Sequence, residues 1–497
     1  MIFLRRSLPI FYNALLLTMV NLLLRLVGTS FQVYLSGRIG AAGIGLLQLV
    51  MSVGGLAVVA GIAGVRTATM YLTAEELGKK RPQNVTWVLS GCFLYSILCS
   101  GIIASAMYAF APWIAESWIG DVRTVHALRL FAVFLPVVCL CNVMVGYFTA
   151  ASRIGTLAAV EVAEQLVSMT VTITALSVWA GNDPVRACLC VILGSSAAAV
   201  MTLLCLILLR LWEKPDTGGQ IPVGRRLGDT AVPLALADVL KSGINTAENL
   251  MVPKRLARNV RIADPLAAFG LVSGMVFPVL MFPACILFGL TELLVPELAR
   301  CAAAGSKGRI SYLVRRSLRI ALLYGLLFGG LEFLLADWLC LRLYNNAEAG
   351  RFLQLYALLI PMLYCDAITD AMTKGLGQQK ICVRYNILTS AMDVALLYLL
   401  LPEYGMWGYF FSFTVTHLLN FILSLRQLLK ITGESIPFSV PAFGVLAALA
   451  AALGAGFFSV PAVQVIGYLG LLGSLLCLFG VTGMEDILWI RGLIRKK

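Results

Sequence analysis

Several ionisable side chains stand inside apolar stretches of the sequence, where chemistry is more plausible than a solvated surface. Arg25 lies near the middle of the apolar run LLLRLVGTSF, and a later run carries Asp238, Lys241, Asn245 and Glu248. The spacing of three or four residues places the last four on one helical face. Charges in hydrocarbon are costly and normally face a cavity or each other. We expect a wet, cavity-lining face, although snorkelling of Arg25 and pairing of Asp238 with Lys241 remain alternatives.

A cluster of positive charge follows that run. Lys254, Arg255, Arg258 and Arg261 fall within the eight residues KRLARNVR. This density predicts an anion-binding surface, with a solvated helix face or a misplaced helix boundary as the alternatives. Arg66 ends an earlier apolar run, so it is either an orientation charge or part of an inner gate.

Acidic residues also occur within apolar stretches. They are Glu161 with Glu164, Asp366 with Asp370, and Asp393. Carboxylates at such depth can bind a proton or a cation for coupling, or they can pair with nearby arginines. Both interpretations remain open.

Motifs of catalysis are missing. The sequence has no Walker loop, no Gly-rich dinucleotide turn, no GxSxG elbow and no DxD pair in a loop, which argues against an enzyme. With two histidines and no CxxC pair, the thirteen cysteines support neither a zinc site nor a disulfide framework, and no cofactor is predicted. The net charge of +13 lies mostly in short loops, so it indicates membrane topology and contact with anionic lipids and not nucleic acid.

The composition defines the elements that must position these residues. Of 497 residues 60% are hydrophobic and 13% charged, and the mean hydropathy is +0.90. These values predict an all-α polytopic membrane protein with about fourteen runs long enough to span a bilayer. The runs are expected at 8–30, 41–64, 86–111, 125–149, 157–180, 185–210, 229–252, 264–290, 317–340, 351–373, 385–401, 406–426, 436–457 and 461–482.

The distribution of lysine and arginine predicts the orientation. Most of them lie in alternate connections, beginning with Arg5 and Arg6 and ending with the basic tail after 482. By the positive-inside rule, both termini are expected in the cytoplasm of a bacterial cell.

Long-range self-similarity predicts the domain organisation. The stretch FQVYLSGRIGAAGIGLLQLV from Phe31 leads to TAEEL, and LMVPKRLARNVRIADPLAAFGLVSG from Leu250 leads to LVPEL. Two parallel six-helix lobes are therefore expected. The predicted parts are an N-terminal lobe at 1–211, a cytoplasmic linker at 212–228, a C-terminal lobe at 229–430, and two extra helices with a basic cytoplasmic tail at 431–497.

Glycines four residues apart predict close helix contacts. Gly270 with Gly274 and Gly325 with Gly329 would lie on single helix faces, where the absence of a side chain lets two backbones approach.

The segments LRLVG at 24–28, VYLSGRIGAAGIGLLQL, TAEELGKKRPQ and LMVPKRL resemble the stage V sporulation protein B-like family of polysaccharide exporters. The superfamily also includes lipid II flippases, O-antigen flippases and multidrug extruders. The resemblance implies two lobes around a V-shaped cavity that opens alternately inward and outward. It also implies a cationic cavity with an arginine on the first helix, which Arg25 matches. Arg66 lies later than the corresponding site, and Lys241 with the Lys254–Arg261 group would supply the remaining charge.

The combined expectation is a flippase for an undecaprenyl-pyrophosphate-linked saccharide, either a peptidoglycan precursor or another cell-wall unit. Substrate contacts are expected from Arg25, Gln48, Arg66, Lys241, Asn245, Glu248, Lys254 and Arg255. Cell-wall synthesis enzymes are possible partners. A cation-coupled multidrug extruder of the same fold and a non-transporting scaffold of a cell-wall synthesis complex remain the alternatives.

Overall fold

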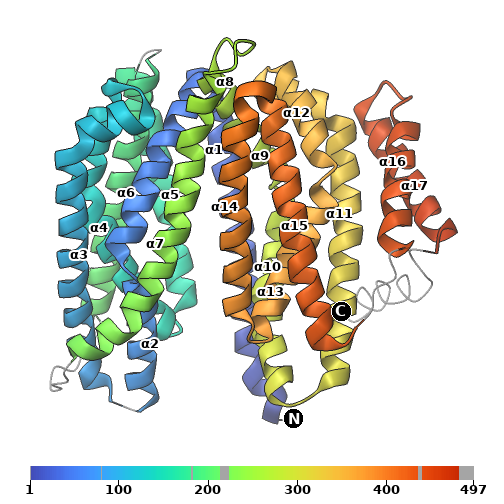
Figure 1. Cartoon of the computed structure of the whole chain (residues 1–497). Helices are drawn as coiled ribbons and strands as arrows, with labels where there is room; N and C mark the ends of the chain where they lie inside the picture. Colours follow the sequence, from blue (N-terminus) through green and yellow to red (C-terminus); the bar gives the residue numbers. More distant parts are fainter. Residues whose placement is uncertain (1, 80, 181–182, 213–222, 435–438, 481–497) are drawn as a thin grey trace. The chain divides into compact units, whose positions relative to one another are not determined.

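The computed structural model describes residues 2–79, 81–180, 183–212, 223–434 and 439–480, and the regular elements in these ranges are all helices (Figure 1). The helices are α1 (Ile2–Ile62), α2 (Val65–Gly78), α3 (Val85–Trp113), α4 (Val125–Ala150), α5 (Ile154–Ala175), α6 (Pro184–Trp212), α7 (Val223–Leu256), α8 (Pro265–Gly270), α9 (Phe277–Leu280), α10 (Ala284–Ala303), α11 (Lys307–Tyr344), α12 (Ala347–Ala357), α13 (Ile360–Gly375), α14 (Gln379–Tyr404), α15 (Met406–Thr432), α16 (Ser439–Ala455) and α17 (Pro461–Leu478).

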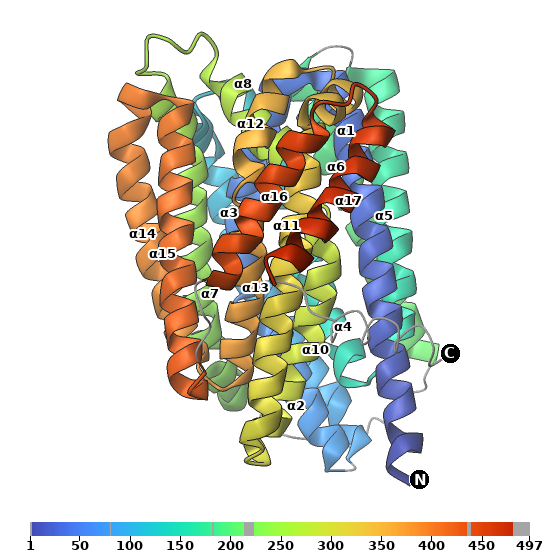
Figure 2. The same ribbon diagram turned by 90° about the vertical axis from the view of Figure 1, so that its right-hand side faces the viewer.

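Helix α1 consists of two arms. Gly40 interrupts it with φ 70° and ψ 179°, a conformation that glycine adopts without a steric penalty. The N-terminus and α2 lie at the same end of the molecule in both views, so the chain reverses direction at this break (Figure 2). The two arms correspond to the first two predicted spans.

The expected number of spans is compatible with the structure. By length and hydropathy, nine helices of the described chain can cross a membrane, or eleven when the bent pairs α8–α10 and α12–α13 are each counted as one span. The predicted fourteen is reached when α1 is divided at Gly40 and α7 and α16 are added. Helix α7 falls short because it is polar, and α16 because it is only 17 residues long.

The described contacts divide the chain into two compact units. Unit 1 comprises Met1–Gly274 and Leu397–Met406, and unit 2 comprises Met275–Leu396 and Trp407–Lys497. Helix α7 therefore packs with the N-terminal helices, although the sequence assigns it to the second lobe. Residues 213–222 of the predicted linker and the basic tail lie outside the described part, and the two six-helix lobes stay a prediction.

Close backbone approaches join α1 to α8 within unit 1. A Cβ added to Gly270 would lie 2.0 Å from the carbonyl oxygen of Ala41, and one added to Gly45 would lie 2.3 Å from that of Leu266. A Cβ on Gly274 would meet Ile44 at 1.9 Å. The predicted packing role of Gly270 and Gly274 is confirmed, and that of Gly325 and Gly329 is confirmed in unit 2, where both meet the α12–α13 segment.

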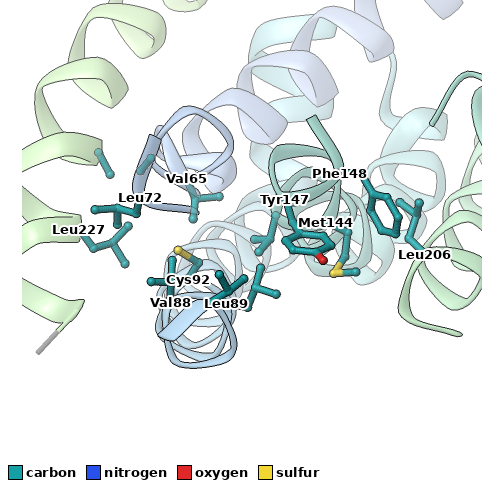
Figure 3. Packing of buried hydrophobic residues seen from close by; sticks show 14 of the residues in the cluster. Val65, Leu72, Val88, Leu89, Cys92, Met144, Tyr147, Phe148, Leu206 and Leu227 are labelled. Carbon is teal, nitrogen blue, oxygen red and sulfur yellow. The ribbon is translucent and has the colours of Figure 1, made fainter. Parts of the chain in front are cut away.

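The apolar core at the α2 end of unit 1 is built from residues of the six helices α2 to α7, and Figure 3 shows most of them. Its labelled members come from α2, α3, α4, α6 and α7; they are Val65, Leu72, Val88, Leu89, Cys92, Met144, Tyr147, Phe148, Leu206 and Leu227. Because Leu227 belongs to this core, the first turns of α7 are held against the N-terminal helices.

Ion pairs fasten the same end of α7. The guanidinium of Arg226 donates to Glu75 at 2.5 Å and to Glu76 at 3.2 Å, and both acids belong to α2. Glu76 is only 2% exposed and also accepts from Asn84 Nδ2 at 2.9 Å. The acidic TAEEL segment at the end of α2 is therefore held by Arg226, which lies at the end of the predicted linker.

In unit 2 the last two helices pack on α11. Helix α16 buries alanines at 447, 451 and 455, and the Tyr468 hydroxyl on α17 donates to the Leu326 carbonyl at 2.7 Å. A stripe of small side chains allows close helix packing where lipid provides no hydrophobic driving force.

We expect Gly270→Ala to lower stability, because the new methyl group collides with the α1 backbone. Overpacking of this kind costs about 1–3 kcal/mol, so the unfolding midpoint in detergent should fall. The matched control is Gly28→Ala, where nothing lies within 4 Å of the added Cβ and alanine favours the helix by up to about 1 kcal/mol. Equal midpoints for the two variants would contradict the packing assignment.

We expect Arg226→Ala to destabilise the protein by about 1–3 kcal/mol, since it leaves the buried Glu76 with one donor fewer. Thermal unfolding in detergent measures this loss. Arg81→Ala is the control, because the Arg81 side chain is exposed and forms no recorded ion pair with a described residue. A midpoint shift that is the same in both variants would show that the Arg226 contacts contribute little.

Candidate binding site on helix α7

Helix α7 crosses unit 1, and the last third of its length is attached to α1. The hydroxyl of Thr246 donates to the Ser52 carbonyl at 3.1 Å, and Asn249 Nδ2 donates to the Ser52 hydroxyl at 3.0 Å. These bonds fix the rotation of α7 about its axis, so the residues one turn further along have defined neighbours.

A cavity of about 480 Å³ lies beside the last turns of α7, and we call it the α7 pocket. Its cationic wall consists of Lys254, Arg255 and Arg258, and its aromatic wall of Trp118 and Tyr398. It also receives side chains from α1 and from the middle of α7, and every contributing element belongs to unit 1.

Two of the three cations are held in place by neighbours. The Lys254 ammonium donates to the Ser117 carbonyl, in the turn that ends α3. The Arg255 guanidinium stacks on the Tyr398 ring at 3.1 Å from its centroid, and its residue is only 8% exposed. Stacking on an aromatic face stabilises a guanidinium and also leaves its edge available for hydrogen bonds.

Arg258 follows α7 in the connection to α8 and is exposed. This connection is fixed to α14, because Asn259 Nδ2 donates to the Glu403 carbonyl at 3.1 Å. Within the described ranges, none of the three pocket cations forms an ion pair with a carboxylate. The pocket therefore holds positive charge that a bound anion can neutralise.

The helix terminus explains part of this charge. Lys254 and Arg255 occupy the last turn of α7, where cations are stabilised by the negative end of the helix dipole. Stabilisation by the helix dipole does not, however, explain why an aromatic wall and a cavity lie in front of these charges.

The structure brings together only some of the predicted site residues. Lys254 and Arg255 line the α7 pocket, and Arg66 lines a separate cavity of about 310 Å³. Arg25, Lys241 and Asn245 are exposed, whereas Gln48 and Glu248 are half-buried; these five line neither cavity. Their predicted substrate contacts stay predictions.

The second cavity lies among α4, α5 and α6, and we call it the acidic cavity. Glu161 and Glu164 line it with Arg66 and Asn142, and Thr202 donates to Glu164 Oε2 at 2.9 Å. The acidic pair of the fifth span therefore lines a cavity that also contains one arginine, and its predicted role in binding a proton or cation, or in pairing with an arginine, stays a prediction.

Sequence reasoning did not identify Trp118 and Tyr398. Each reaches the pocket from a helix distant from α7 along the chain, and aromatic residues near the ends of spans are common for interfacial reasons alone. Only the tertiary structure, which brings Trp118 and Tyr398 next to Lys254 and Arg255, distinguishes these two from other aromatic residues at the ends of spans.

Comparison with known proteins identifies the family of this chain. A sequence model of the MatE family matches residues 17–180 and 233–399, two segments of similar length on either side of the predicted linker. The chain is 22% identical to stage V sporulation protein B of Bacillus subtilis (strain 168) over 436 residues, which cover 85% of this chain and 84% of that one.

Solved structures share the fold at low sequence identity. A lipid II flippase MurJ in an inward closed conformation matches with a TM-score of 0.69 and 13% identity, over 95% of this chain and all of that one. An inward-facing multidrug resistance MATE transporter of the MOP superfamily matches with a TM-score of 0.65 and 12% identity, over 84% of this chain and all of that one. The chain belongs to the MatE family, and it is a multi-pass membrane protein with the fold that these two solved structures share.

Proposed function

We propose that the protein is a flippase for an undecaprenyl-pyrophosphate-linked saccharide, such as a peptidoglycan precursor or another cell-wall unit. It moves the head group from the inner to the outer leaflet by alternating access, with both termini in the cytoplasm. The observation that supports this best is the uncompensated positive charge of the α7 pocket.

The physical requirement of such transport matches the pocket chemistry. A hydrated pyrophosphate cannot cross hydrocarbon unaided, because the cost of removing its water is prohibitive. Arginine and lysine replace that water with charge-assisted hydrogen bonds. The aromatic wall suits a sugar ring next to the phosphate, while the lipid tail stays among the apolar helices.

The remaining predicted residues have assigned roles in this proposal. Arg25 and Lys241 contact the pyrophosphate earlier in the cycle, and Gln48, Asn245 and Glu248 serve as sugar or gating groups. Arg66 provides a further substrate contact at the α2 end of unit 1. Anionic membrane lipids contact the basic loops, and cell-wall synthesis enzymes are candidate partners.

A second candidate is a cation-coupled multidrug extruder of the same fold. The acidic cavity favours it, because Glu161 and Glu164 line this cavity together with Phe131 and Phe134. Cationic drugs suit such a wall, whereas they would be repelled by the α7 pocket. A non-transporting scaffold is the third candidate, and it predicts no transport by the wild-type protein.

We expect Arg258→Ala to raise the half-saturating concentration of lipid-linked saccharide roughly 10- to 100-fold. The reason is the loss of a charged hydrogen bond worth about 1.5–3 kcal/mol. A leaflet-accessibility assay in proteoliposomes, with a panel of lipid-linked sugars, measures the effect. Arg38→Ala removes an equal charge from an exposed site that does not line the pocket, so it should match wild type. Equal values for both variants would remove the pocket from the proposal.

We also expect vesicles containing the wild-type protein to retain a cationic dye as well as protein-free vesicles do, under an imposed proton or sodium gradient. We expect this retention because the positively charged α7 pocket repels a cationic dye. Dye release that is fast in wild type and abolished by Glu164→Gln, without saccharide transport, would favour the extruder.

A further inference from the structure

Helix α11 carries a carboxyl group without a compensating charge. Glu332 is 5% exposed, and its Oε2 has no hydrogen-bond partner among the described residues. Glu332 forms no ion pair with any residue that the structure describes. An ionised carboxylate buried in this way is very costly, so its environment favours the neutral acid. Acidic groups within the membrane are rare and usually functional.

The position of Glu332 is defined by the face of α11 on which it lies. Gly325, Gly329 and Glu332 are spaced by four and three residues, so they share one face. A Cβ on Gly325 would lie 2.6 Å from Pro361 Cα, and one on Gly329 would lie 3.0 Å from the Ala357 carbonyl. This face therefore packs on the break between α12 and α13, where the two helices are bent by 55°.

The contacts also show which part of α12 Glu332 faces. Gly350, near the start of α12, meets Asp337 further along α11, so the two helices run antiparallel. Glu332 lies between Gly329 and Asp337 in the sequence of α11, and it therefore faces the last turns of α12. The last carbonyls of α12 form the negative end of its dipole, and that of Tyr356 accepts from the Leu359 N–H at 2.9 Å. They attract a carboxylic acid proton and repel a carboxylate.

The neighbouring titratable groups do not supply a counter-charge. The phenols of Tyr324 and Tyr364 and the thiol of Cys340 lie close enough to Glu332 to interact with it electrostatically. Each phenol already donates elsewhere: Tyr324 to the Pro283 carbonyl at 2.8 Å and Tyr364 to that of Leu280 at 3.2 Å. From α10, α12, α13, α16 and α17, no described lysine, arginine or histidine pairs with Glu332.

We propose that Glu332 is a proton-binding site of unit 2 and that its occupancy sets the bend between α12 and α13. With the proton bound, the neutral acid packs against the end of α12. When the proton leaves to water, the carboxylate is repelled by the α12 carbonyls and the two helices must separate or change their angle. Coupling of this site to transport rests on the proposed function, whereas proton binding itself does not.

Infrared difference spectroscopy of the reconstituted full chain across a pH series tests proton binding. We expect a carboxylic acid band that changes with pH in wild type and is absent in Glu332→Gln. The control is Asp337→Asn, which removes an exposed carboxyl five residues further along the same helix and should keep the band. A band unchanged in Glu332→Gln, or no pH-dependent band in wild type, overturns the proposal. Glu332→Leu, which buries no amide, serves as a second variant if glutamine impairs folding.

Transport under an imposed proton gradient tests the coupling. In Glu332→Gln we expect the rate to become independent of the gradient, while Asp337→Asn still responds as wild type does. A rate that follows the gradient in Glu332→Gln would overturn the coupling. If wild type shows the infrared band but moves no lipid-linked saccharide, the proton site stands and the proposed function fails.

Discussion

The attachment of helix α7 to the N-terminal helices is the constraint on which the rest of unit 1 depends. Lipid gives no hydrophobic driving force between helices, so a polar helix is held only by close packing and specific bonds. Helix α7 has such bonds along its length: Arg226 pairs with α2 at one end, and Lys254 meets the end of α3 at the other. Between them Thr246 binds the Ser52 carbonyl. Without these contacts neither the pocket nor the core of Figure 3 would be closed on the α7 side.

The same attachments explain why the pocket can keep its positive charge. Lys254 and Arg255 are stabilised by a carbonyl and an aromatic face, neither of which cancels their charge. An aspartate or glutamate in place of these neutral partners would have lowered the cost of burying the two cations. Its negative charge would also have excluded an anion from the pocket. Charge that is held by neutral partners is pre-organised for a ligand, because little side-chain entropy is lost on binding.

The sequence indicated much of the fold because lipid imposes strict rules on helix length and polarity. The close contacts of Gly270 and Gly274 followed from spacing alone. The aromatic wall of the pocket could not be predicted, since Trp118 and Tyr398 reach Lys254 and Arg255 only through tertiary packing. Grouping α7 with the N-terminal helices was equally inaccessible, because a repeat in the sequence specifies equivalent segments and not which of them are in contact. Glu332 stands in an apolar run like any other intramembrane acid, and only its burial without a partner distinguishes it.

Within the described part of the chain, the cations of the α7 pocket and the carboxyl group of Glu332 are each without an opposite charge beside them, and that separation has a mechanistic consequence. Cations line the α7 pocket beside an aromatic wall, whereas Glu161 and Glu164 line another cavity and Glu332 is buried in unit 2. If an acid lay in the α7 pocket, it would neutralise the site meant for an anion. If an arginine lay beside Glu332, it would hold the carboxylate permanently ionised and abolish proton exchange. Under the proposed function, the anion site and the proton site must therefore be separate sites. The glycine-mediated contact of α11 with the α12–α13 break is an element of unit 2 that can convert the loss of a proton into a helix movement.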